Sequence, residues 1–481
     1  MNASQPGRLR LPTPVHRHPE AVAGLLLGWM LLLLGWNHGL SVAILAVPVG
    51  TILLASAVSL LLWVGDERPA QYLALGAGAT AAPVLALLLS GAELSALWVA
   101  LLGVAVWFLA GRIALSGFPE VEGAPAVAKD WTAAARIATD QALLAWFHVL
   151  LRPPQDAERE RVLAELPVWE GLICAKGGMD PQRWHPQPPD LLRVDARERQ
   201  LFGRAYKQIH WEAGSPDAEG LPAAAAWQAQ MKQRKAHAWV LEHPGKPRPW
   251  LLTIHGYRMG SPLTDLRAFD PKLLHEQWGL NLASIVLPLH GPRRQGVFSG
   301  NGYLDGDFST FIHAQRQAIW DMRRLLSWLR LNRHAPSVGV YGLSLGGYNA
   351  ALLAGLESDL SCVVAGIPVF DMAETLWRHM PPTEQSVLEH EGVDLERLRT
   401  VFAPVSPGSF ASQTPAKALG IFAGAVDALV WPDQPLRLSQ HWGCRPPWWF
   451  EGAHLSFAGT AAQHQCLRQT LRAGGLIDAN G

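Results

Sequence analysis

Four long apolar stretches, separated by short polar turns, fill the first part of the chain. A helix needs about 20 consecutive apolar residues to cross the hydrocarbon core of a membrane. These stretches contain almost no charge and no polar face, which a helix packed on a soluble core would show. We therefore predict four transmembrane helices within residues 21–117, in the stretches Ala21–Trp36, Leu40–Val64, Tyr72–Leu89 and Leu94–Gly111.

Two other interpretations fit part of this pattern. The first stretch follows three arginines in residues 1–20 and so resembles a cleaved signal peptide. Alternatively, all four stretches are buried helices of a large soluble core. The three further apolar stretches disfavour export of a soluble enzyme, and the missing polar faces disfavour a soluble core.

Arginines near the ends of the apolar stretches predict the orientation of the chain, because Lys and Arg concentrate in cytoplasmic flanks. The leader at residues 1–20 has three arginines, the second loop has Arg68, and Arg112 follows the fourth stretch. The first and third loops have none. We expect a cytoplasmic leader at residues 1–20 and an integral protein of the inner or plasma membrane. Everything after residue 117 then lies on the cytoplasmic side.

Residues 118–236 show a less regular pattern. Ala133–Val149, Ala157–Leu166 and Ala223–Ala236 are helix candidates, and Tyr206–Trp211 is a candidate strand. We interpret this segment as a mostly helical linking region.

From residue 237 onward, short buried strands alternate with helices. Such alternation predicts a doubly wound, mostly parallel α/β sheet over residues 237–481. The alternation breaks at residues 371–411, which are charged and helical and form either a candidate lid or a surface excursion. The expected strands are His237–His243, Trp250–His255, Ala283–Leu289, Leu360–Ile367, Ala418–Ala423 and Arg445–Phe450, with the strand before Ser344; His313–Leu331 and Ala461–Arg472 are expected helices.

The strand before Ser344 ends in the pattern Gly-x-Ser-x-Gly, formed by Gly342, Ser344 and Gly346. A small-residue helix, Tyr348–Leu356, follows at once. A sharp strand-to-helix turn of this kind holds a serine hydroxyl clear of the sheet. The bare pattern often arises by chance, but the strand and the helix are the context that it requires.

The chain resembles the α/β-hydrolase superfamily over roughly residues 237–475. The resemblance rests on four separated features that follow one another along the chain as they do in that family: the His-Gly after an early strand, the serine turn, an aspartate after a late strand and a histidine after the last strand. In that family the catalytic triad runs Ser, then Asp or Glu, then His along the chain. The resemblance implies Ser344 as the nucleophile and Asp427, after a late strand, as the acid, with Asp433 as the alternative. It implies His454, after the last strand, as the base, with His464 in the closing helix as the alternative.

The resemblance also implies an oxyanion hole made of two backbone N–H groups. One belongs to Leu345, directly after the nucleophile. The other comes from the loop after the strand Trp250–His255, where the sequence His-Gly resembles a family element. This implicates the N–H of Tyr257, with Arg258 as the other choice. His255 and His290 both precede a glycine, and we interpret them as residues that shape turns.

Arg293 and Arg294 lie in a loop at the carboxyl end of a strand, where α/β folds bind ligands. They are candidate substrate-binding residues for an anionic head group such as phosphate or carboxylate. The alternative is a structural ion pair with Asp305, Asp307 or Asp321.

Composition excludes several other classes of function. Lys and Arg together number 40, as do Asp and Glu, so the formal net charge is zero and nothing indicates nucleic-acid binding. The four cysteines are widely separated, which argues against a zinc site and a disulfide framework. We expect reduced thiols, no metal and no cofactor.

These observations predict a membrane-anchored serine hydrolase that cleaves a carboxylic ester or thioester through an acyl-enzyme. The membrane location favours a small-molecule or lipid-like acyl substrate. A serine peptidase and a non-catalytic binding module with a hydrolase-like domain are the alternatives. A transporter would need polar residues inside the apolar stretches, which offer essentially none.

Overall fold

The computed structural model describes residues 9–10, 18–63, 66–151, 156–175, 177–231, 235–305 and 307–478. Residues 1–8 and 11–17, which make up most of the predicted leader, lie outside this range. The chain divides into two compact units. The N-terminal unit contains Met1–Leu151, Ala423–Leu436 and Trp449–Thr460, and the sheet unit contains Arg152–Phe422, Arg437–Trp448 and Ala461–Gly481.

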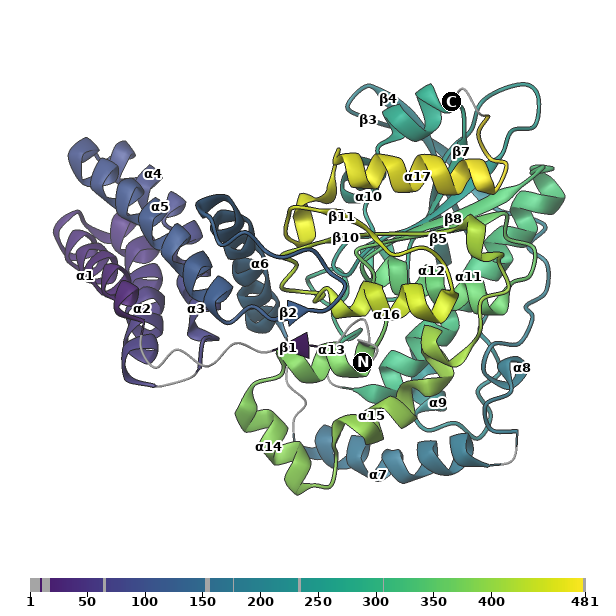
Figure 1. The fold of residues 1–481 in the computed structure, drawn as a ribbon, viewed down its shortest axis with the longest axis horizontal. Helices are drawn as coiled ribbons and strands as arrows, with labels where there is room; N and C mark the ends of the chain where they lie inside the picture. Colours follow the sequence, from purple (N-terminus) through teal and green to yellow (C-terminus); the bar gives the residue numbers. More distant parts are fainter. Residues whose placement is uncertain are drawn as a thin grey trace, which may run out of the picture. The chain divides into compact units, whose positions relative to one another are not determined.

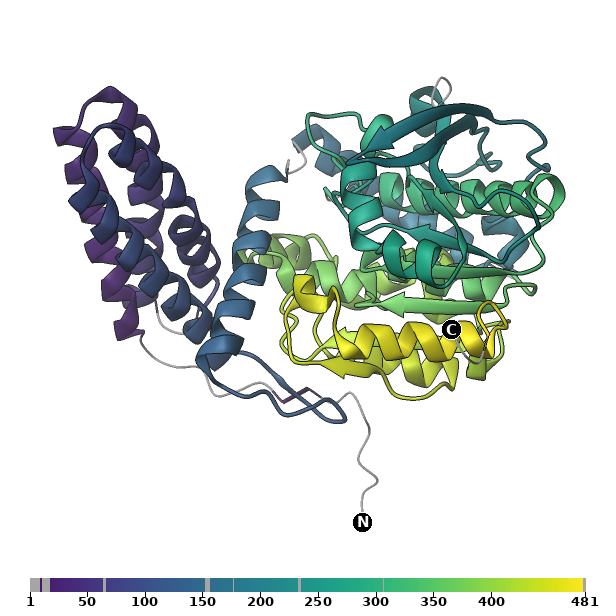
Figure 2. The same ribbon diagram turned by 90° about the horizontal axis from the view of Figure 1, so that it is seen from above.

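Apolar helices running side by side open the N-terminal unit (Figure 2). Among the described residues, four stretches are long and apolar enough to cross a membrane: Pro19–Asn37, Leu40–Leu62, Pro69–Leu89 and Glu93–Ser116. The prediction of four such helices is confirmed. The third stretch is divided at Thr80, whose hydroxyl donates to the carbonyl of Ala77 at 2.6 Å. The helices are α1 (Val22–Asn37), α2 (Leu40–Leu62), α3 (Pro69–Ala79), α4 (Ala81–Leu89) and α5 (Glu93–Ser116).

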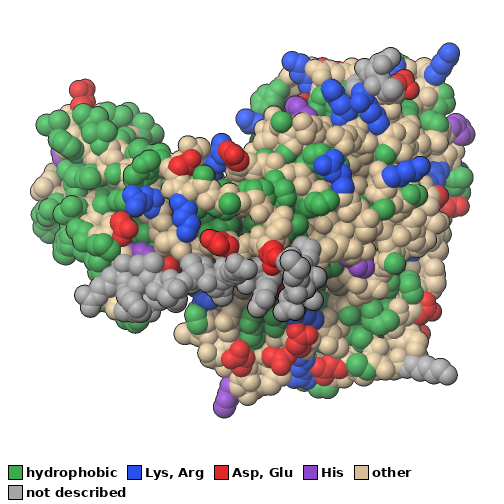
Figure 3. Space-filling view, in the orientation of Figure 1, with side chains coloured by type: hydrophobic (Ala, Val, Ile, Leu, Met, Phe, Trp, Pro, Cys, Tyr) green, Lys and Arg blue, Asp and Glu red, His purple; other side chains and the backbone are tan. Residues whose placement is uncertain are grey.

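Small residues set the packing between these helices. A Cβ atom on Gly28 of α1 would lie 2.9 Å from the carbonyl oxygen of Gly50 on α2, and the reverse distance is also 2.9 Å. Such close backbone approach is typical of helices that associate in lipid. Hydrophobic side chains cover much of the face of this bundle that Figure 3 shows. Leu33 and Trp36 are among the exposed large hydrophobic residues of its helices. That surface suits a hydrocarbon environment better than water.

Helix α6 (Trp131–Leu150) follows the bundle and packs against α3 and α5. Its N-cap is Asp130, whose carboxylate accepts from the N–H of Ala133. At the closest approach, a Cβ atom on Gly111 of α5 would lie only 1.9 Å from the carbonyl oxygen of Ala134. Between α5 and α6, the short strand β2 (Glu120–Val121) pairs with β1 (Leu9–Arg10).

The larger sheet has nine strands among the described residues, in the order β11-β10-β9-β8-β6-β7-β5-β4-β3. Neighbours from β7 through β6, β8 and β9 to β10 are parallel, and β3, β4 and β5 form antiparallel pairs that join β7. The central strands are fully buried and therefore almost entirely apolar. The strands are β3 (Asp195–Leu201), β4 (Arg204–Glu212), β5 (Lys235–Leu241), β6 (Trp250–Ile254), β7 (Asn281–Ile285), β8 (Val338–Leu343), β9 (Cys362–Gly366), β10 (Leu419–Gly424) and β11 (Trp448–Phe450).

Helices cover both faces of this sheet (Figure 1). Tyr341 of β8 marks one face: its ring packs at 5.0 Å from Phe269 after α10 (Pro262–Ala268), and its hydroxyl accepts from Gln463 of α17 (Ala461–Ala473). Helices α11 (Phe308–Asn332) and α12 (Leu345–Leu356) lie on the opposite face. This arrangement confirms the predicted doubly wound α/β-hydrolase architecture.

The sheet begins earlier than residue 237, where the sequence pattern placed the start of the α/β domain. Strands β3 and β4 lie inside the segment expected to be a mostly helical linker, and β4 includes the candidate strand Tyr206–Trp211. Strand β3 is an exposed edge strand of mostly polar residues, so it lacks the alternation that marks a half-buried strand. The helices of this segment are α6, α7 (Asp156–Cys174), α8 (Pro181–Trp184) and α9 (Ala224–Met231).

The candidate lid forms three short helices, α13 (Met372–His379), α14 (Pro382–His390) and α15 (Leu395–Phe402), before α16 (Asp433–Trp442). Arg399 joins α15 to α13 by ion pairs with Asp371 and Glu374. A cavity of about 420 Å³ lies between this insertion and Tyr348 of α12. The role of residues 371–411 as a lid stays a prediction.

Candidate active site

Ser344 is the single residue between the end of β8 and the start of α12, and its backbone has φ 56° and ψ −115°. A positive φ is strained for any residue except glycine, and such strain clusters at functional sites. The N–H of Ser344 donates to the carbonyl of Gly366 on β9 at 2.9 Å, and its own carbonyl accepts from Tyr348 at 3.0 Å. These bonds hold the serine in the turn at the carboxyl end of the strand.

Two glycines make this turn possible because the backbone approaches itself too closely for a side chain. A Cβ atom on Gly342 would lie 1.9 Å from the carbonyl oxygen of Gly346. A Cβ atom on Gly346 would lie 1.9 Å from the carbonyl oxygen of Ile254 on β6. The Gly-x-Ser-x-Gly pattern is therefore a steric requirement of this turn.

The loop after β6 lies directly beside the serine. A Cβ atom on Gly256 would be 3.5 Å from Cβ of Ser344. Nε2 of His255 accepts from the N–H of Leu287 at 3.0 Å and its Nδ1 donates to the carbonyl of Gly256 at 2.8 Å, so this histidine shapes the turn. Tyr257 comes next in the loop, and Leu345 opens α12. The segments that carry both proposed oxyanion donors thus flank Ser344.

Asp427 and His454 form a buried pair in the N-terminal unit. Nδ1 of His454 donates to Oδ2 of Asp427 at 2.7 Å, and the two residues are 4% and 1% exposed. Oδ1 of Asp427 accepts from the N–H groups of Leu429 at 3.0 Å and Val430 at 2.8 Å, which fixes the carboxylate. Because Nδ1 carries the proton, Nε2 of the neutral ring has a free lone pair. This is the tautomer that a general base requires.

The charges around His454 favour its protonated form. Burial lowers the pKa of His454, but the charge of Asp427, the hydrogen bond that His454 donates to Asp427 and the charge of Asp140 outweigh burial and leave this pKa raised. Of the alternatives, Asp433 opens α16 and His464 lies within α17. The aspartate and histidine that are hydrogen-bonded to each other are Asp427 and His454, the pair preferred from the sequence.

A third carboxylate, Asp140 of α6, lies against this pair and was missed from the sequence. It is fully buried, and Oδ2 accepts from the N–H of Ala428 at 2.9 Å and from the N–H of His454 at 3.0 Å. Burial and then the charge of Asp427 raise the pKa of Asp140 to about 8. The one signal in the sequence was an acidic residue on the apolar face that Ala133 and Ile137 share.

Arg293 forms one of the structural ion pairs that were the alternative to a contact with substrate. Its guanidinium is fully buried and lies 2.7 Å from Asp321 of α11. It also donates to the carbonyl of Val286 at 3.1 Å. Arg294 is exposed and donates to the carbonyl of Gly291. Nearby, Nδ1 of His290 bonds to the carbonyl of Pro288, and burial lowers the pKa of this histidine far below its ordinary value.

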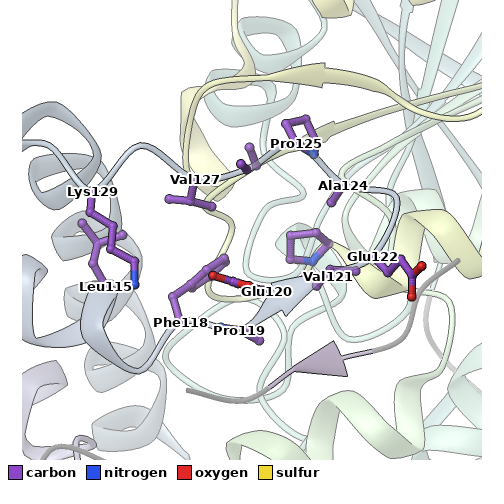
Figure 4. Close-up of a pocket in the computed structure, with 13 residues that line it drawn as sticks. Leu115, Phe118, Pro119, Glu120, Val121, Glu122, Ala124, Pro125, Val127 and Lys129 are labelled. Carbon is purple, nitrogen blue, oxygen red and sulfur yellow. The ribbon is translucent and has the colours of Figure 1, made fainter. Parts of the chain in front are cut away.

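A cavity of about 320 Å³ lies in the N-terminal unit beside the loop that carries Asp427 (Figure 4). The chain between α5 and α6 curves around it, from Leu115 to Lys129, and Ala425 and Pro432 complete the lining. Phe118, Val121 and Val127 make much of the wall apolar. Within the described ranges, no group of three or more His, Cys, Asp or Glu residues is arranged to hold a metal.

No protein-family model matches the chain. The chain is 36% identical over 322 residues to the uncharacterized protein MT2702 of Mycobacterium tuberculosis strain CDC 1551 / Oshkosh, which covers 66% of this chain and 77% of that protein. It is 36% identical over 300 residues to the uncharacterized protein Rv2627c of strain ATCC 25618 / H37Rv, covering 62% and 72%. A solved acetyl xylan esterase 1 from Thermoanaerobacterium sp. JW/SL YS485 matches with a TM-score of 0.42 and 15% identity, over 67% of this chain and 95% of the esterase.

Proposed function

We propose that this chain, which belongs to the same family as the Mycobacterium tuberculosis proteins MT2702 and Rv2627c, is a serine hydrolase, because its α/β-hydrolase fold carries a serine turn and an aspartate–histidine pair in the required chain order. The observation that carries the proposal is the buried hydrogen bond from His454 Nδ1 to Asp427, which leaves Nε2 as a base. The strained turn at Ser344 supports it independently, because such strain is retained where it serves a function.

In the proposed mechanism, Ser344 Oγ attacks the acyl carbon while His454 Nε2 takes its proton. The C–O or C–S bond to the leaving group then breaks, and His454 returns the proton to the departing alcohol or thiol. Water, deprotonated by the same histidine, releases the acid and restores the serine. Asp427 stabilises the imidazolium at both steps. The N–H groups of Leu345 and Tyr257 stabilise the oxyanion, and losing one such donor typically lowers the rate ~10²–10³-fold.

Sheet topology supports this assignment. Ser344 directly follows β8, and Asp427 lies just beyond β10, with β9 between these parallel strands. The carboxyl ends of parallel strands share one edge of a sheet, where α/β folds bind ligands. His454 follows β11, the next strand in the sheet. The chain order Ser, Asp, His is that of α/β-hydrolases.

We further propose a lipid-like acyl substrate and a membrane location with the catalytic part on the cytoplasmic side. The cavity beside the Asp427 loop supports the substrate class. Its lining includes Leu115, in the last turn of the fourth apolar stretch, and the end of a membrane-spanning helix lies near the lipid head groups. The alternation of arginine between the loops supports the orientation.

Labelling by a fluorophosphonate probe tests the proposed activity, because the probe reacts with activated serines whatever the substrate. The full chain in detergent is compared with Ser344→Ala, His454→Ala and the matched control Ser337→Ala, which lies just before the same strand. We expect labelling of the wild type and of Ser337→Ala but not of Ser344→Ala, whose kcat for a substrate should fall on the order of 10⁶-fold.

Equal labelling of Ser344→Ala would exclude this serine as the nucleophile. A folded wild-type protein that is not labelled would favour the non-catalytic binding module. A peptidase would label like an esterase, so a panel of matched p-nitrophenyl esters, thioesters and anilides then separates these activities. We expect turnover of the esters and thioesters to exceed that of the anilides.

A further inference from the structure

One face of α6 is fitted to the loops that carry the acid and the base. Ala133, Ala134 and Ile137 pack in one apolar cluster with Val426, Ala428 and Ala453. Arg136, on the same face, donates from its guanidinium to the carbonyl of Glu451. Residues three, four and seven positions apart share one side of a helix, so this contact runs along two turns. Asp140, seven residues after Ala133, ends it.

Asp140 joins the two loops to each other. Ala428 directly follows Asp427, and its N–H donates to Oδ2 of Asp140 at 2.9 Å. The N–H of His454 itself donates to both oxygens of the same carboxylate, at 3.0 Å and 3.1 Å. These contacts span 288 and 314 residues of sequence. One side chain therefore fixes the backbone next to the acid and the backbone of the base.

Asp140 is fully buried, and the free energy of burying a carboxylate is unfavourable. An apolar residue would fill the same site at a lower free-energy cost unless the carboxylate makes hydrogen bonds that the fold requires. The partners of Asp140 explain its burial: without Asp140, the N–H groups of Ala428 and His454 would be buried and unpaired. The loops would then shift to find other partners. A shift of about 1 Å in a catalytic group is enough to cost ~10²-fold in rate.

The same helix is fixed to the last apolar helix of the membrane region. Gly111 of α5 lets the carbonyl of Ala134 approach closer than any side chain would permit. The ring of Trp131 packs at 5.9 Å from Phe108, and the guanidinium of Arg112 lies 5.0 Å from its centre. Helix α6 thus contacts α5 and the Asp427 and His454 loops at the same time.

From this geometry, we propose that Asp140 is a positioning residue. It fixes the positions of Asp427 and His454 relative to each other and connects their loops to the membrane helices. The N-terminal region then has a role in catalysis beyond that of an anchor. The proposal rests on the serine-hydrolase function proposed above.

The test measures kcat and KM for p-nitrophenyl butyrate, and the rate of fluorophosphonate labelling, with the full chain in detergent. The variants are Asp140→Ala, Asp140→Asn and the control Thr139→Ala, an exposed neighbour on α6. We expect Asp140→Ala to lower kcat and the labelling rate ~10²-fold with little change in KM. Asp140→Asn keeps an oxygen that accepts both N–H groups, so we expect it to restore kcat to within about tenfold of the wild type.

The outcomes separate the two proposals. A folded wild-type protein that is not labelled refutes the hydrolase function itself, and labelling that does not depend on Ser344 refutes the proposed nucleophile. Ser344-dependent labelling that is equally fast in Asp140→Ala and the wild type refutes the positioning role alone. If Asp140→Ala loses its cooperative unfolding transition, the kcat values of Asp140→Asn and Asp140→Leu test the positioning role instead. A folded Leu variant with full kcat, or an Asn variant no better than Leu, overturns the proposal.

Discussion

Replacing Asp427 by asparagine should trap His454 in the wrong tautomer. The two oxygens of Asp427 have different partners: Oδ1 accepts from Leu429 and Val430, and Oδ2 accepts from His454. An asparagine would place its single oxygen where two N–H groups donate, since the reverse orientation loses two hydrogen bonds of about 1 kcal/mol each and leaves both donors buried. Its NH₂ group would then face His454.

An NH₂ group facing Nδ1 requires that nitrogen to accept, so the proton moves to Nε2. A ring protonated there cannot take the proton of Ser344. Loss of the correct tautomer in enzymes with this triad lowers kcat about 10⁴-fold. At about 1.4 kcal/mol per tenfold, this corresponds to roughly 5 kcal/mol of lost transition-state stabilisation.

The assay is hydrolysis of p-nitrophenyl butyrate by the full chain in detergent, with thermal unfolding as a check on folding. Asp433→Asn serves as the comparison, because Asp433, the alternative acid, is also buried and opens the next helix. We expect the Asp427 variant to lose about 10⁴-fold in kcat and the Asp433 variant to remain within about tenfold of wild type. A folded Asp427→Asn that also stays within about tenfold, or an Asp433→Asn that is the more damaging, would refute the reasoning.

Three further changes test other parts of the structure. Gly346→Ala should destabilise the protein by about 3 kcal/mol or more and abolish labelling, because its Cβ atom would meet the carbonyl of Ile254 at 1.9 Å; Gly171→Ala, with no atom within 4 Å, should change the unfolding midpoint little. Arg293→Met should cost about 3–5 kcal/mol in urea unfolding because it leaves the buried Asp321 without its ion-pair partner, whereas a stable variant would show that this pair is dispensable. Asp140 has a pKa raised from 3.8 to about 8, so its favourable contribution is complete below 3.8 and is lost as the pH rises through about 8. Asp140→Asn does not titrate, so its unfolding midpoint should rise relative to wild type across that window, and a difference that is constant with pH would contradict the raised pKa.

Features governed by local chemistry could be predicted from the sequence. The apolar helices follow from their length, and the serine turn follows from the steric need for Gly342 and Gly346. The alternation of strands and helices after residue 237 indicated the α/β class, because buried parallel strands are apolar throughout. Asp427 was preferred to Asp433 on its distance from the strand end, and it is the aspartate that bonds to His454.

Features that depend on distant partners could not be predicted. Asp140 acts on residues 288 and 314 positions away, and no local pattern encodes that proximity. Strand β3 is polar because it is an exposed edge, so its sequence resembles a loop. Arg293 was a candidate for substrate binding because of its place at a strand end, but its partner, Asp321, comes from a helix that packs there only in the fold.

Peptide mapping by mass spectrometry after reaction of the full-length protein with a fluorophosphonate tests the central claim most directly. We expect the phosphonyl group on Ser344, in wild-type protein and in Thr139→Ala, with the modification greatly slowed in His454→Ala. Modification of a different serine, or a folded protein in which Ser344 stays unmodified, would contradict the account.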